Sequence, residues 1–213
     1  MAHCGRIGRV TPSPELFARW SALLPDRPGL GERLLERWSQ PHRDHHGPAH
    51  LLEVLQAVDL LGHEADDPEA VCLAAWFHDA VHDGRPDDEA RSAALAVREL
   101  SVDGADAGLV EHVRSLVLMT REHDPHDPDG CVLSDADLSV LAAPAARYAA
   151  YVRGVRAEYA HVQEVAFRRG RADVLRTLLG RPRLFRTRTG HDRWEAAARA
   201  QVARELAALT SGR

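Results

Sequence analysis

Two histidine–aspartate pairs follow one another at the end of an apolar stretch of the chain. The run A-A-W-F-H-D-A-V-H-D contains His78 with Asp79 and His82 with Asp83. Polar or titratable groups left without partners in an apolar environment cost on the order of several kcal/mol. Imidazole and carboxylate groups are good ligands for divalent transition metals, so metal coordination would satisfy them. We therefore interpret this segment as part of a metal site.

Further candidate ligands lie on either side of this run. Five of the thirteen histidines of the chain fall within the window 42–63. His46 and His50 flank the expected beginning of one helix, so both can lie near the same end of it. Asp137 interrupts the apolar run L-S-D-A-D-L-S, whereas the neighbouring Asp135 is interpreted as an N-terminal helix charge. Ligands from three separate helices would make a rigid cage with room for water.

The elements expected to position these residues are helices. Apolar residues recur at spacings of three and four along most of the chain, and no alternating strand pattern persists. His82 would then lie one turn beyond His78 on the same face of a helix. These patterns predict an all-α fold, a single bundle of about eight to ten helices, in which the polar segment 122–130 is a loop. The predicted helices cover residues 15–24, 30–39, 48–62, 68–82, 87–101, 106–119, 134–142, 144–161, 163–179 and 191–209.

Length, charge and cysteine usage narrow the class of protein. A chain of 213 residues suits one buried core, so we expect a single domain over 1–213. The net charge of −5 argues against a nucleic acid polymer as partner, and the absence of lysine excludes a Schiff-base or phosphate-loop lysine. Cys4, Cys72 and Cys131 fit neither a disulfide framework nor a C-x-x-C site, which favours the cytoplasm. We expect no export signal and no membrane association.

The motifs H-G-P-A-H, H-D and the distant D-A-D together resemble the metal-binding signature of the HD superfamily of metal-dependent phosphohydrolases. The resemblance implies four metal ligands, namely His50, His78, Asp79 and Asp137. It extends to a small bacterial branch of predicted HD phosphohydrolases through Q-P-H-R-D-H-H-G-P-A-H-L-L, V-R-A-E-Y and R-P-R-L-F-R-T, and covers about residues 17–206. The resemblance therefore implies an HD-type helical domain with that core.

Part of the pattern is also similar to that of the cyclic-nucleotide phosphodiesterases, Y-H-N-x-x-H followed by H-D-x-x-H. This resemblance implies that His46 is the general acid that protonates the leaving oxygen and that His82 lies beside the metal-activated water. His45 and Gly47 stand where the pattern has Tyr and Asn. Either His46 or His82 would manage the proton, a role suited to a group that titrates near neutrality.

The expected reaction is hydrolysis of a phosphate ester, either a monoester or a diester, with nucleotides among the candidates. The cofactor would be one or two divalent ions per chain, with Mn, Mg, Co, Ni, Fe and Zn all open, because a metal ion lowers the pKa of bound water toward neutrality. His123, in T-R-E-H-D-P, and His82 are candidates for a second ion or for the outer shell of the first. Two other interpretations stay open: a dinuclear iron oxygenase of the HD type, and a non-catalytic metal or nucleotide sensor.

Arginines are the candidate contacts to a small phosphorylated substrate. The planar guanidinium binds pairs of phosphate oxygens, and nine arginines lie in the segment 168–193. Most of these are expected on a solvated surface, with Arg181 and Arg183 in R-P-R-L-F-R-T as the exceptions. Arg156 and Glu158 in V-R-A-E-Y are candidates for a buried pair near the site, as a structural ion pair or as a substrate contact.

Overall fold

Ten α-helices make up most of the chain that the computed structural model describes, residues 14–102, 104 and 106–211. No β-strand occurs among these residues, so the prediction of an all-α helical bundle is confirmed. Cys4 lies outside the described residues. The elements are α1 (Pro14–Leu23), α2 (Pro28–Trp38), α3 (Pro48–Leu61), η1 (Gly62–Glu64), α4 (Pro68–Phe77), α5 (Asp88–Ser101), α6 (Ala107–Met119), α7 (Pro128–Leu138), η2 (Ser139–Ala142), α8 (Ala145–Glu158), α9 (Glu164–Gly180) and α10 (Arg188–Thr210), where η denotes a 3₁₀ helix.

Proline marks where several of these helices begin. A proline at the first helical position costs little, because its missing N–H would have no partner inside the helix and its fixed φ already suits a helix. The helices α2, α3, α4 and α7 begin in this way, with Pro28, Pro48, Pro68 and Pro128. Three of them, α3, α4 and α7, carry candidate ligands at or next to one end, so these prolines help to fix the helices that position the candidate ligands.

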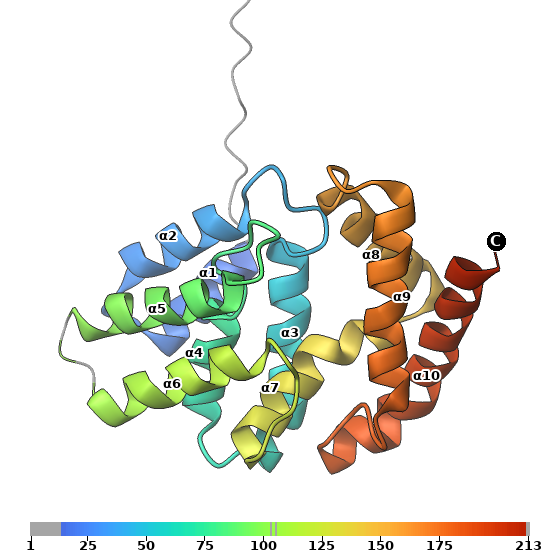
Figure 1. Ribbon diagram of the computed structural model, residues 1–213. Helices are drawn as coiled ribbons and strands as arrows, with labels where there is room; N and C mark the ends of the chain where they lie inside the picture. The colour runs from blue at the N-terminus through green and yellow to red at the C-terminus, as the bar shows by residue number, and fades with distance from the viewer. Residues whose placement is uncertain (1–13, 103, 105, 212–213) are drawn as a thin grey trace, which may run out of the picture.

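The helices form two groups on either side of α3 and α7 (Figure 1). The helices α1, α2, α4, α5 and α6 lie on one side, and α8, α9 and α10 lie on the other. Buried hydrophobic residues form two clusters, one from α1 to α7 and one from η2 to α10, where a single core was expected. Trp194 packs against both clusters and joins them. Within the described residues, each helix is either too short or too polar to cross a membrane.

Helix α4 ends at Phe77, earlier than the predicted end at residue 82. After Phe77, the carbonyl oxygen of Asp79 accepts a hydrogen bond from a side chain and not from a helical N–H group. The donor is Arg43, whose Nη1 lies 2.6 Å from this oxygen. The prediction that His82 lies on the same helical face as His78 was therefore wrong. His82 reaches the site from the bend after α4 instead.

Helix α7 begins at Pro128, before the predicted beginning at residue 134. The side chain of Asp127 caps it by accepting a hydrogen bond of 2.6 Å from the backbone N–H of Gly130. An aspartate cap followed by proline favours a helix start, so the predicted loop 122–130 contains the first residues of this helix. Asp135 consequently lies near the C-terminal end of α7, and its interpretation as an N-terminal helix charge was wrong.

The buried carboxylate of Asp135 attaches the segment before α10 to α7. It accepts hydrogen bonds from the backbone N–H groups of Arg186 and Thr187, both at 2.8 Å, and from the Thr187 hydroxyl at 2.6 Å. Gly190 lies so close that a Cβ atom there would be 2.5 Å from the carboxylate. Burial raises the pKa of Asp135 to about 6 although these hydrogen bonds lower it. One carboxylate on α7 thus anchors the segment that leads into α10.

We expect Asp135→Ala to destabilise the protein by about 2–3 kcal/mol, because it leaves two buried backbone N–H groups without an acceptor. Urea unfolding of the chelated protein measures the change. Asp192→Ala is the control, since the Asp192 side chain is 64% exposed on α10, and it should stay within about 0.5 kcal/mol of the wild type. Equal stability of the two variants would contradict the role of Asp135.

Candidate metal centre

Two buried imidazole rings face each other at the centre of the site. His50 lies in the first turn of α3 and His78 directly follows α4, with side chains that are 2% and 1% exposed. Their Nε2 atoms are 3.4 Å apart. Asp137, near the end of α7, places Oδ1 3.0 Å from Nε2 of His50 and 3.6 Å from Nε2 of His78. Three helix ends that are far apart in sequence therefore meet at one point.

Asp79 adds a fourth donor to this group, which we call the central cluster (His50, His78, Asp79 and Asp137). Its Oδ2 lies 3.4 Å from Nε2 of His78 and 3.9 Å from Nε2 of His50. Donors bound to one ion at about 2.0–2.2 Å stand about 3.0–3.6 Å apart at octahedral or tetrahedral angles. The observed separations lie in or close to that range, so His50, His78 and Asp137 fit a single ion, with Asp79 beside them.

A hydrogen bond determines which ring nitrogen of His78 can bind a metal. Nδ1 lies 2.8 Å from the carbonyl oxygen of Ala75 on α4, so in the neutral ring it is Nδ1 that carries the proton. Nε2 then presents its lone pair to the central cluster. The Trp38 ring packs beside both imidazoles, with its centroid 5.3 Å from that of His78 and 6.2 Å from that of His50. These contacts fix the orientation of the ligands.

The pKa values of the two carboxylates of the central cluster are lowered by the neighbouring imidazoles although the carboxylates are largely buried. Burial lowers the pKa of His78, but Asp79 and Asp137 outweigh burial and raise that pKa well above its usual value. Burial raises the pKa of Asp137, but His78 and His50 outweigh it and lower that pKa well below its usual value. A positive charge next to these carboxylates is therefore favourable, and a divalent cation would supply one.

Arg43 joins the two segments that carry most of the site. Its buried guanidinium donates hydrogen bonds to the carbonyl oxygens of His46 at 3.1 Å, Asp79 at 2.6 Å and Ala80 at 3.3 Å. It also stacks over the Trp38 ring at 5.5 Å. The loop before α3 and the turn after α4 are thereby held together. Sequence reasoning missed Arg43, for which the only signal was its place in the histidine-rich segment H-R-D-H-H.

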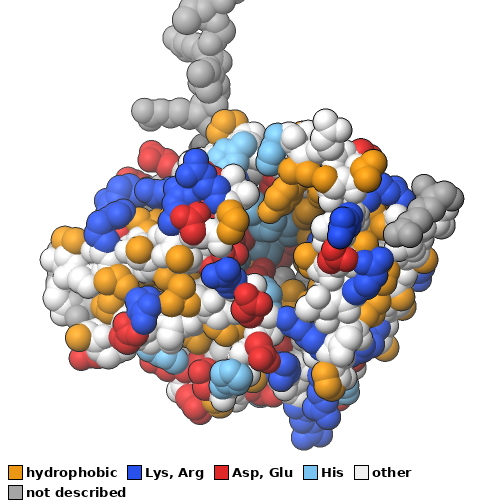
Figure 2. All heavy atoms as spheres, viewed as in Figure 1, with side chains coloured by type: hydrophobic (Ala, Val, Ile, Leu, Met, Phe, Trp, Pro, Cys, Tyr) orange, Lys and Arg blue, Asp and Glu red, His pale blue; other side chains and the backbone are white. Residues whose placement is uncertain are grey.

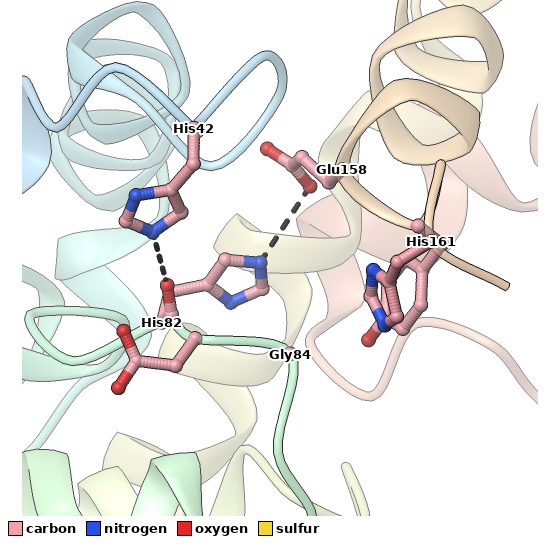
Figure 3. Close-up of a pocket in the computed structure, with 7 residues that line it drawn as sticks. His42, His82, Gly84, Glu158 and His161 are labelled. Atoms are coloured by element: carbon pink, nitrogen blue, oxygen red, sulfur yellow. Dashed lines mark hydrogen bonds and ion pairs between the residues drawn. The ribbon is translucent and has the colours of Figure 1, made fainter.

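A second group of side chains lies beside the central cluster, and we call it the outer triad (His46, His82 and Glu158). Nδ1 of His46 lies 2.6 Å and Nε2 of His82 lies 3.6 Å from the same oxygen, Oε2 of Glu158. The His46 and His82 rings lie against each other with their centroids 4.0 Å apart and their planes tilted by 32°. Glu158 faces the His82 ring (Figure 3), and both residues line a cavity of about 260 Å³. Nε2 of His82 is buried and lacks a hydrogen-bond partner among the described residues.

The outer triad opens toward solvent through a hollow between the two groups of helices. Histidine side chains are visible at the base of this hollow in the space-filling view (Figure 2). The side chain of His46 is 22% exposed, and those of Asp79 and Asp137 are 17% and 16% exposed. The central cluster is therefore reachable by a small molecule on its carboxylate side, while its two imidazoles are buried.

Glu158, at the end of α8, is the member of the outer triad that sequence reasoning did not assign as a site residue in its own right. Its Oε1 accepts hydrogen bonds from the backbone N–H groups of Asp44 at 2.9 Å, His45 at 2.7 Å and His46 at 2.9 Å. Burial raises the pKa of Glu158, but His46 and His82 outweigh it and lower that pKa far below its usual range. One carboxylate therefore both shapes the loop before α3 and orients His46.

The predicted pairing of Arg156 with Glu158 was wrong. Arg156 Nε instead lies 2.9 Å from Oε2 of Glu164, and the guanidinium lies 4.7 Å from the centre of the Phe167 ring. Residues two apart on a helix do not face each other, which separates the two members of the predicted pair. Arg156 also donates to the carbonyl oxygen of Tyr159 at 2.8 Å. Arg156 stabilises the turn after α8 and contacts no member of the central cluster or of the outer triad.

His123 approaches the central cluster from the loop after α6. Its Nε2 lies 3.4 Å from Oδ2 of Asp137, and its Nδ1 lies 3.2 Å from the Ser134 hydroxyl. Its φ of 48° is in the left-handed region, which is uncommon for a residue other than glycine. Arg181 donates hydrogen bonds to the carbonyl oxygens of His123, at 2.9 Å, and of Glu122. Arg181 therefore supports the conformation that brings His123 to Asp137.

Two further residues singled out from the sequence lie in opposite environments. Arg183 is exposed and hydrogen-bonds to no described residue. His45 is buried between the rings of His50 and Tyr151, each with its centroid 4.6 Å from that of His45. Burial lowers the pKa of His45, so the ring is neutral. His45 packs the floor of the site, and Arg183 lies on the surface.

Comparisons of the chain with protein-family models, with curated proteins and with solved structures gave no match. What the side chains themselves establish is a buried His/Asp group that could hold a metal ion, made of His50, His78 and Asp137, with Asp79 beside it. A second group that could do so is the outer triad.

We expect Asp79→Asn to lose most of its bound metal, because an anionic oxygen of the central cluster is replaced by a neutral amide. Loss of a residue that only orients a ligand lowers metal affinity by about 10–100-fold. Loss of a direct ligand should lower it by at least as much. Elemental analysis of chelated protein, reloaded separately with Mn²⁺, Co²⁺ and Fe²⁺, measures it. Asp83→Asn is the matched control, since Asp83 is 37% exposed and pairs with Arg91. Stoichiometric metal in Asp79→Asn would falsify the ligand assignment.

Proposed function

We propose that this protein is a metal-dependent hydrolase of phosphate esters and a member of the HD superfamily. One observation carries the proposal: the four residues that the sequence pattern selects as ligands converge. One donor atom each of His50, His78 and Asp137 lies within 3.6 Å of the other two, and Oδ2 of Asp79 lies 3.4 Å and 3.9 Å from the two imidazole nitrogens. A site is best inferred from the chemistry and mutual geometry of its residues, and here a pattern read along the chain coincides with a buried donor set.

In this reaction the protein would hold the metal-ligating side chains in position. An ion bound by the central cluster would supply Lewis-acid chemistry, activating water and neutralising charge on the phosphoryl oxygens. Ala75 and Trp38 orient the His78 ring so that its Nε2 faces inward. Asp79 and Asp137 contribute the negative charge that favours a divalent cation over a monovalent one. The partly exposed carboxylate side of the cluster is where a phosphate group would enter.

His46 is the proposed proton donor to the leaving group. Its ring centroid lies 5.7 Å from that of His50, so it is next to the central cluster, yet its Nδ1 is engaged by Glu158. A carboxylate on one ring nitrogen orients an imidazole and stabilises its protonated form, which leaves the other nitrogen for the substrate. Burial lowers the pKa of His46 below its usual value, and the hydrogen bond that the ring donates to Glu158 only partly offsets this. His82 is the alternative donor.

A dinuclear iron oxygenase of the HD type is the second candidate function. Asp137 presents Oδ1 to His50 and His78 and presents Oδ2 to His123, an arrangement that suits a carboxylate shared by two ions. Two irons per chain and a turnover that depends on O₂ would favour this candidate. Hydrolysis that proceeds equally well without O₂ would favour the phosphohydrolase.

The proposed activity is tested on chelated protein to which single ions are returned. We expect hydrolysis of at least one class among sugar phosphates, nucleotides and aryl phosphates, supported by at least one of Mn²⁺, Mg²⁺, Co²⁺, Ni²⁺, Fe²⁺ and Zn²⁺ and absent after chelation. Asp79→Asn should lose hydrolysis together with metal, whereas Asp83→Asn should retain both. No hydrolysis of any class with any of these ions would count decisively against the proposal.

We expect His46→Ala to keep its metal and to lose about 10²–10⁴-fold in turnover on an ester with a poor leaving group. With nitrophenyl phosphate the loss should shrink, because that leaving group hardly needs a proton. Steady-state kinetics on the two esters measure the difference, and His63→Ala, at a side chain that is 64% exposed, is the control. An equal loss on both esters would show that His46 has another role, and loss of metal would make it a ligand.

A further inference from the structure

A cavity of about 450 Å³ adjoins the candidate site on the side of α8 and α9, and we call it the aromatic cavity. His46 forms part of its wall, and so does Tyr151, whose ring packs against the ring of His45. The cavity therefore begins at the proposed proton donor. Its volume suits a small organic group, since ligand pockets commonly measure about 300–1,000 Å³.

The walls of the aromatic cavity are apolar and carry several rings. Tyr151, Tyr159 and Phe167 contribute the rings, and Val155 and Val174 contribute aliphatic side chains. Val174 is 52% exposed, so this wall is open to solvent and is not filled by the hydrophobic core of the protein. Aromatic side chains pack favourably on flat rings, by offset stacking or edge to face. The composition of the walls thus favours an aromatic occupant.

Arg171 is the one arginine in the wall among the described residues, and its charge is already compensated. Its Nε lies 2.8 Å from Oε1 of Glu205, and its Nη2 donates to the Tyr151 hydroxyl at 2.8 Å. The side chains of Arg171 and Glu205 are only 10% and 8% exposed, so this pair is not free to bind phosphate. The mostly apolar walls offer a charged or polyhydroxylated group few hydrogen bonds to replace those it makes with water. An apolar group has no such hydrogen bonds to lose.

His46 lies between the central cluster and the aromatic cavity. Its ring centroid is 5.7 Å from that of His50, and the same residue lines the aromatic cavity. If phosphate is held at the central cluster and the leaving oxygen faces His46, the organic group of the ester extends into the aromatic cavity. The identity of that group is then decided by the cavity walls.

We propose that the aromatic cavity binds the organic group of the substrate and selects phosphate esters of aromatic alcohols over those of small polyols. The inference rests on the function proposed above and names its substrate class. Gly170 on α9 sets the size of the cavity, because it lines the wall and a Cβ atom there would meet nothing within 4 Å. Gly180, at the end of the same helix, has the same free space but does not line the cavity.

Gly170→Leu is the test, with Gly180→Leu as its matched control. Leucine forms helices better than glycine does, so α9 should tolerate both changes. We expect Gly170→Leu to lower kcat/KM for naphthyl phosphate by about tenfold or more, because the added side chain occupies space that the aromatic group needs, and to change kcat/KM for methyl phosphate by less than about twofold. Gly180→Leu should alter neither value. Equal effects of Gly170→Leu on the two esters, or none, would overturn the inference.

A binding measurement separates this inference from the proposed hydrolysis. Calorimetric titration with naphthylphosphonate, which cannot be hydrolysed, should show weaker binding to Gly170→Leu than to Gly180→Leu, with methylphosphonate as the size control. That difference without hydrolysis of any ester would support the cavity and count against the hydrolase. Hydrolysis without that difference would overturn the cavity alone. A change of oligomeric state on light scattering in Gly170→Leu alone would make the cavity an interface between copies of the chain, which also overturns the inference.

Discussion

The Nε2 atoms of His50 and His78 lie 3.4 Å apart, and Oδ1 of Asp137 lies 3.0 Å from Nε2 of His50. This close arrangement constrains the positions of the surrounding helices. Groups of this kind are costly to bury unless each finds a partner of suitable charge. His50 and His78 are almost fully buried, so the surrounding helices must deliver carboxylates to them with little tolerance in position. The ends of α3, α4 and α7 do so, and the packing of Trp38 against both rings removes the freedom that would let them separate.

The backbone segments next to the central cluster are held in place by side-chain contacts and not by regular helix. Arg43 replaces helical amides as the donor to carbonyl oxygens after α4, and Glu158 accepts three consecutive backbone N–H groups before α3. Both residues bind loop backbone, which is where functional side chains are often carried on a rigid scaffold. His46 and His82 are therefore positioned by two charged residues whose own contacts are largely buried. Their rings can be well oriented even though neither lies in a helix.

The parts of the structure that could be predicted from the sequence are those encoded locally. Apolar spacing predicted the helices, and the resemblance carried by three short motifs predicted that His50, His78, Asp79 and Asp137 lie together, as their side chains do. The remainder depends on contacts between distant segments. The end of α4 is fixed by a side chain more than thirty residues away, and Glu158 reaches a loop more than a hundred residues away. Neither of these contacts can be predicted from the spacing of residues along the chain. The beginning of α7 is different, since the Asp127 cap before Pro128 was a readable signal.

The division of the hydrophobic interior into two clusters has a consequence for how such a protein can change. The helices that deliver the central cluster belong to the first hydrophobic cluster, and those that border the aromatic cavity belong to the second. Substitutions on α8 and α9 that face the aromatic cavity can therefore remodel its wall while the geometry of the central cluster stays intact. This independence ends at Glu158, whose carboxylate crosses from α8 to the loop before α3, and at Tyr151, whose ring packs against that of His45. A search for variants with altered selectivity would be free to explore much of α8 and α9 but would have to leave these two positions unchanged.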